Sequence, residues 1–170
     1  MKVLFLAFCG CCITGVHYGT GQHTSDIIPE NLPIALRYWW CCEPLYILVN
    51  MFIKLSIAVF LLRISVVRTQ KIIIWLTLIV SEVYGLFFFI LFILQCRPTS
   101  YFWARFSPTP PEHGTCISVT ITAGVFFGYS AICCLTDWTL SILPGFMVWN
   151  LQMNLRTKFS VAMILAVGAM

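Results

Sequence analysis

IIIWLTLIVSEVYGLFFFILFIL, residues 72–94, carries a single charged side chain, Glu82. The hydrocarbon core of a bilayer is about 30 Å thick, and roughly 20 consecutive apolar residues cross it as a helix. The stretch does not alternate apolar and polar residues, as a strand of a membrane barrel does. It also lacks the polar face of a helix in a soluble protein. Residues 72–94 are therefore predicted to form a transmembrane helix.

The same composition extends over most of the chain. Hydrophobic residues make up 60% of its 170 residues and charged residues 9%, whereas an ordinary soluble domain has about 25% charged residues. Residues 39–62 and 120–149 are long enough for full spans, while 3–16 and 159–170 are long enough only for parts of spans. A backbone in lipid must satisfy its own hydrogen bonds, so we expect helices throughout. The prediction is an all-α polytopic transmembrane helix bundle, a single membrane domain over 1–170 with three full and two partial spans.

The amino-terminal segment has two interpretations. Residues 1–16 contain one basic residue, an apolar stretch and small residues, which is typical of a signal peptide. The segment also leads directly into a loop with a recognisable motif, described below. That continuity favours a partial transmembrane helix.

The charges between the spans predict which loops face the cytoplasm. Loop 63–71 holds three basic residues and no acid, and loop 150–158 holds two basic residues and no acid. Loops 17–38 and 95–116 mix basic and acidic residues and are rich in proline and glycine, so they are predicted to be outer and irregular. The net charge of +4 thus reflects topology. No basic patch with interleaved aromatics points to nucleic acid.

Polar side chains within the spans form a candidate polar core. Four of them recur on the first full span at spacings of three, four and four, which places them on one helical stripe; two more are the lone charges of the other spans. One interpretation is a binding or signalling core, and the other is interhelical hydrogen bonding that holds the packing. Similar depth predicts that Lys54 pairs with Asp137, or failing that with Glu82. The candidates are Glu43, Tyr46, Asn50, Lys54, Glu82 and Asp137.

Cysteines near the predicted outer face suggest a disulfide. Cys96 and Cys116 bracket the outer loop, and Cys41 and Cys42 lie at the outer end of the first full span. The outer face is oxidising, so a disulfide is expected there. The loop is joined either to the helix end or to itself through Cys96 and Cys116, and the sequence leaves both open. The other cysteines lie in apolar stretches and are interpreted as packing residues.

No catalytic or cofactor chemistry is indicated. The sequence shows no Ser/His/Asp or Cys/His set with catalytic spacing, so we expect no enzyme and no cofactor. His17 and His23 flank GTG (19–21), but two histidines in a loop are too few ligands for a metal site. We expect a turn shaped by glycine and no metal.

Four motifs, in order, resemble one known family. They are GTGQH (19–23), EPLYILVNMFIKLSIAVFLLRI (43–64), LQCRPTSYFWARF (94–106) followed by Cys116, and DWTLSILPGFMVWNLQMNLRTKFSVAMILAVGA (137–169). Together they resemble the fungal rhodopsin-domain family of integral membrane proteins, whose members include receptors. The family has seven helices. The first and seventh lack counterparts here and the sixth stops at Met170, so the resemblance implies a chain truncated at both ends.

The resemblance implies a receptor-like protein that senses an external cue. It implies no retinal chemistry, because the retinal-linking lysine of true rhodopsins lies on the last helix and Lys54 is no substitute. Expected partners are the lipid bilayer and a cytosolic transducer at loops 63–71 and 150–158, with the plasma membrane favoured; oligomeric state is left open. The alternatives are a transporter, a membrane accessory protein of a secondary-metabolite pathway, or a non-functional truncated paralogue.

Overall fold

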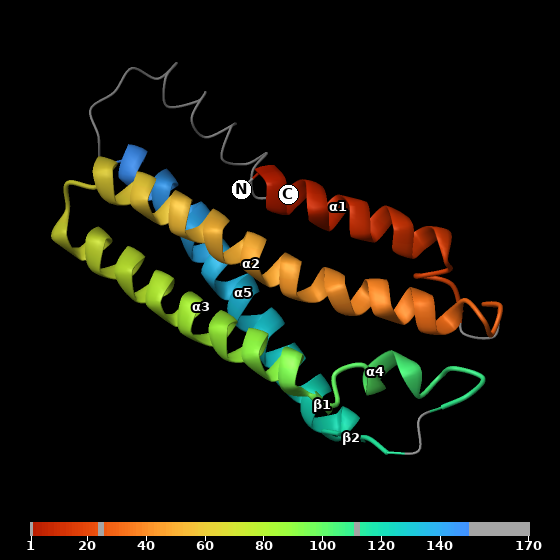
Figure 1. The fold of residues 1–170 in the computed structure, drawn as a ribbon. Helices are drawn as coiled ribbons and strands as arrows, with labels where there is room; N and C mark the ends of the chain where they lie inside the picture. Colours follow the sequence, from red (N-terminus) through yellow and green to blue (C-terminus); the bar gives the residue numbers. More distant parts are fainter. Residues whose placement is uncertain (1, 24–25, 111–112, 150–170) are drawn as a thin grey trace. The chain divides into compact units, whose positions relative to one another are not determined.

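The computed structural model describes residues 2–23, 26–110 and 113–149. These residues form helices α1 (Lys2–His17), α2 (Leu32–Ile64), α3 (Arg68–Leu94), α4 (Tyr101–Ala104) and α5 (Val119–Trp149), with two short strands, β1 (Cys96–Arg97) and β2 (Thr115–Cys116) (Figure 1). The chain divides into two compact units. Unit 1 comprises residues 1–52 and 86–126, and unit 2 comprises residues 53–85 and 127–170.

The predicted all-α membrane fold is confirmed. Helices α2, α3 and residues Val119–Phe146 of α5 are each long and apolar enough to cross a bilayer. The helix α1 is apolar but shorter. The predicted partial span 159–170 lies outside the described residues.

The helices extend beyond the predicted spans. Helix α2 begins at Leu32 and α3 at Arg68, whereas hydropathy placed the starts at 39 and 72. Hydropathy marks the length that lipid accepts, but polar residues such as Arg and Gln also form helix well and carry it past that length. Pro33 fits because it lies in the first turn of α2, where a missing N–H breaks no helical bond. Part of the loop predicted to be irregular is thus helical.

A hairpin of three residues joins α2 to α3 in unit 2. The Ser65 backbone N–H donates to the Leu61 carbonyl at 2.9 Å, and the Ser65 hydroxyl lies 3.3 Å from Gln70 Oε1. Such a short connection makes the two helices antiparallel neighbours. Arg63, Arg68 and Lys71 around this hairpin are exposed.

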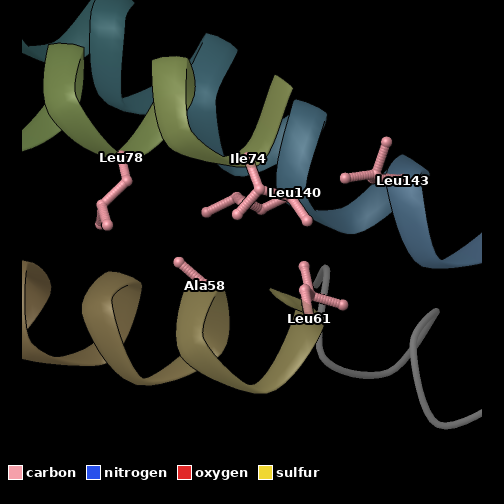
Figure 2. Close-up of a cluster of buried hydrophobic side chains, with 6 residues drawn as sticks. All are labelled: Ala58, Leu61, Ile74, Leu78, Leu140 and Leu143. Carbon is pink, nitrogen blue, oxygen red and sulfur yellow. The ribbon is translucent and has the colours of Figure 1, made fainter. Parts of the chain in front are cut away.

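The core of unit 2 is formed where α2, α3 and α5 meet. Figure 2 shows side chains of the three helices pointing toward one another. Ala58 and Ile74 have no exposed surface, and the other members are at most 7% exposed. The cluster consists of Ala58, Leu61, Ile74, Leu78, Leu140 and Leu143.

Loop 95–116 of unit 1, predicted to be the outer loop, is more ordered than its prolines suggested. Strands β1 and β2 pair antiparallel, with Cys96 opposite Cys116 and Arg97 opposite Thr115. A Cβ on Gly114 would overlap the Tyr101 ring of α4, so this position accepts only glycine without rearrangement. The prediction of an irregular loop 95–116 missed these elements, because a two-residue ladder closed by a distant cysteine has no local periodicity.

Candidate functional site

A charged lysine is buried among the apolar helices of unit 2. The Lys54 side chain is 4% exposed, and its Nζ lies 3.1 Å from Asp137 Oδ1. The same ammonium donates a hydrogen bond to Thr136 Oγ1 at 2.8 Å. Thr136 Oγ1 in turn donates to the Cys133 carbonyl at 2.9 Å. Two consecutive residues of α5 therefore hold one cation of α2.

The charged residues lie deep within their helices. Lys54 is ten residues from the end of α2 and Asp137 is twelve from the end of α5. At about 1.5 Å per residue these are depths of roughly 15 and 18 Å. Glu82 lies fourteen residues into α3, or roughly 21 Å. A charged side chain at such depth in lipid raises the free energy of the protein. The ion pair between Lys54 and Asp137 offsets part of this cost.

Glu82 adds a second carboxyl group near the same cation. Lys54 is close enough to act electrostatically on Glu82. Glu82 Oε1 is buried and has no hydrogen-bond partner among the described residues. One lysine can neutralise only one of the two carboxylates. The arrangement therefore leaves a carboxyl group that can take a proton or meet a positive group.

The rest of the predicted stripe has other surroundings. Tyr46 packs against Phe8 of α1, with ring centroids 6.1 Å apart, and Asn50 Nδ2 donates to the Tyr46 carbonyl at 3.4 Å. Glu43 is partly buried. All three belong to unit 1, while Lys54 belongs to unit 2. The structure thus gathers Lys54, Asp137 and Glu82 of the six candidates.

Thr136 is a site residue that the sequence analysis missed. It is 6% exposed and accepts the Lys54 hydrogen bond. A single threonine in an apolar run gives little signal, since a threonine hydroxyl commonly bonds to its own helix backbone. Its position next to Asp137 was the one available indication.

Among the candidate cysteines, the structure joins Cys96 to Cys116 by a disulfide. Cys41 and Cys42 are free thiols. Of the two arrangements that the sequence left open, the structure thus contains the one that closes the outer loop on itself. Cys42 instead faces Cys12 of α1, a cysteine that the sequence analysis assigned to packing.

Aromatic side chains in unit 1 surround the start of α2. The Trp40 and Trp103 rings meet edge to face at 5.6 Å, and Trp39 stacks on Phe102 at 5.9 Å. The Arg37 guanidinium lies over the Trp103 ring at 5.9 Å. Tryptophans with a nearby cation are typical of a membrane–water interface. This supports placing the start of α2 at a bilayer surface.

Comparison with known proteins is consistent with this architecture. A family model of the fungal rhodopsin domain matches residues 1–170. A SAT4 family membrane protein of Emericella nidulans is 28% identical over 158 residues, an alignment that covers 89% of this chain and 38% of the relative. The chain thus spans well under half the length of this curated relative. No solved structure matches the chain.

Proposed function

The chain belongs to the fungal rhodopsin domain family and is a multi-pass membrane protein, and we propose that it acts as a receptor-like sensor of an external cue. In this proposal it works in the plasma membrane, without enzymatic or retinal chemistry. The observation that carries the proposal is the ion pair of Lys54 with Asp137 in an apolar surrounding. A pair that joins two spans resists separation of the helices, so a cue must supply compensating contacts to change their packing.

The hairpin between α2 and α3 is the proposed output surface. Arg63, Arg68 and Lys71 are exposed, and within the described residues they form no ion pair. Three free cations beside a tight turn suit a cytosolic transducer with an acidic surface. Loop 150–158, the other proposed contact, lies outside the described residues.

A transporter is the second candidate, and Glu82 favours it. A buried carboxyl group without a hydrogen-bond partner, close to a lysine, is the kind of group that proton-coupled transport uses. In that case Glu82 would exchange its proton with both sides of the membrane, and protons would move only while it is present.

Two assays on the full chain separate the candidates. The first reconstitutes the protein in liposomes with a pH-sensitive dye and imposes a proton gradient. The receptor proposal expects no flux above empty liposomes, whereas a transporter expects flux that Glu82→Gln abolishes.

The second assay places a photo-crosslinking residue at Val66, which is 83% exposed in the hairpin. The receptor proposal expects one cytosolic adduct that is lost when the three hairpin cations become glutamine. The control crosslinker at Thr109, in the outer loop, should not capture this protein. Flux that depends on Glu82, together with no adduct at Val66, would overturn the receptor proposal.

A further inference from the structure

Two cysteines that are far apart in sequence face each other in unit 1. Cys12 Sγ of α1 lies 3.6 Å from Cys42 Sγ of α2. Each belongs to a vicinal pair, and Cys11 is close enough to interact electrostatically with Cys41 and Cys42. Cys12 and Cys42 are thus the one facing pair among these four thiols for which the structure gives a short contact.

The facing thiols lie in the middle of an ordered helix contact. Phe8 packs on Tyr46. At the other end, a Cβ built on Gly15 would lie 3.4 Å from Tyr38 Cβ, so the absence of a side chain lets the helices approach closely. From Phe8 to Cys12 to Gly15, the contact residues move along α1 by four and then three positions. Their partners on α2, from Tyr46 to Cys42 to Tyr38, move in the opposite direction by four positions each time. This is a consistent antiparallel register, and it holds the two sulfurs opposite each other.

We propose that Cys12 and Cys42 form an oxidisable dithiol site that a small hydroperoxide converts into a disulfide between α1 and α2. Both thiols are only partly buried, so a small oxidant has access. The sulfurs must approach from 3.6 Å to about 2.05 Å, a movement of about 1.5 Å. The site is distinct from the Cys96–Cys116 disulfide and does not depend on the proposed receptor role.

The hydroperoxide is the only oxidant that disulfide formation between Cys12 and Cys42 requires. One sulfur attacks the outer oxygen and breaks the O–O bond, which yields a sulfenic acid and an alcohol, or water if the oxidant is hydrogen peroxide. The second sulfur attacks the sulfenic sulfur, the S–S bond forms, and water leaves. Two thiols lose two electrons and two protons in total, and the peroxide bond accepts both electrons.

Metal binding is the other use of clustered thiols. Within the described residues no group of three or more His, Cys, Asp or Glu side chains is arranged to hold a metal ion. A zinc site needs three or four converging ligands, whereas a disulfide joins two sulfurs, and Cys12 and Cys42 supply one facing pair. Oxidation is therefore the chemistry that this geometry favours.

The test is hydrogen peroxide titration of the purified full chain, followed by differential alkylation and peptide mass spectrometry. We expect Cys12 and Cys42 to lose their free thiols together, to appear in one cross-linked peptide pair, and to recover with dithiothreitol. Cys42→Ser should abolish the pair. Cys134→Ser, a change at an exposed free thiol on α5, should leave it intact.

The native chain makes the test independent of how the variants fold, because the cross-linked peptide needs no substitution. The proposal is overturned if peroxide joins Cys12 to Cys11 or Cys42 to Cys41. It is overturned equally if Cys12 and Cys42 oxidise singly, or stay reduced at a peroxide concentration that oxidises Cys134.

Discussion

Replacing Lys54 with methionine should destabilise the protein by leaving Asp137 without its cation. Methionine keeps the length of the lysine stem and removes the ammonium, so the change isolates the charge. The same change removes the hydrogen bond to Thr136. Glu82 also loses the nearby positive charge.

The expected loss follows from the geometry of the pair. Two charges 3.1 Å apart attract by about 5 kcal/mol at an effective dielectric constant of 20. Removing one partner of a fully buried pair costs about 3–5 kcal/mol. The Lys54 side chain is 4% exposed but that of Asp137 is 53% exposed, so the described helices bury the pair only in part and the loss should fall below that range. We therefore expect Lys54→Met to lower the free energy of unfolding by roughly 2 kcal/mol.

The assay is a double-mutant cycle of unfolding in mixed micelles. Lys54→Met combined with Asp137→Asn should recover at least about 1 kcal/mol of the summed single losses, more than the average of about 0.6 kcal/mol for an interhelical hydrogen bond in a membrane protein. Arg63→Met, at an exposed cation on the same helix, should change stability by less than about 0.5 kcal/mol. Losses that add within about 0.5 kcal/mol would refute the reasoning.

Two glycine substitutions test the packing of the helices and of the outer loop. Gly128→Ala would place a Cβ 2.7 Å from Tyr84 Oη, so melting experiments should show a loss of about 1–3 kcal/mol that Tyr84→Phe partly restores by removing that oxygen; no restoration would contradict the contact. Gly114→Ala would overlap the Tyr101 ring, and should reduce the fraction of protein with the outer-loop disulfide, as counted by maleimide gel shift. Gly124→Ala, which meets no atom within 4 Å, is the control for both and should be neutral or stabilising by up to about 1 kcal/mol.

Local composition was sufficient to predict the spans. The stretch 72–94 dictates a helix by itself, because lipid offers no partner for an unpaired backbone group. The predicted positions of the helix ends were less accurate. Helix α3 begins at Arg68 among polar residues, where hydropathy no longer distinguishes a helix from a loop. Helix α2 begins at Leu32, directly before Pro33, and proline is a residue that commonly marks a loop.

The polar site was only partly predictable. Counting residues along each helix placed Lys54 and Asp137 at similar depth, and the structure brings them together. The depth of a residue in the membrane does not give the direction in which its side chain points around the helix axis. It therefore could not show that Thr136 accepts a hydrogen bond from the Lys54 ammonium. The contact of Cys12 with Cys42 depends on the register between α1 and α2, which no local pattern encodes.

We infer that the chain crosses the membrane with its basic hairpin inside and its disulfide-closed loop outside. Single cysteines introduced by Val66→Cys and Thr109→Cys, with the free cysteines of the described residues replaced by serine, test this directly with a membrane-impermeant maleimide on intact cells. We predict that the Thr109 position labels at once and the Val66 position labels only after permeabilisation. Labelling of both positions from the same side of the membrane would contradict the account.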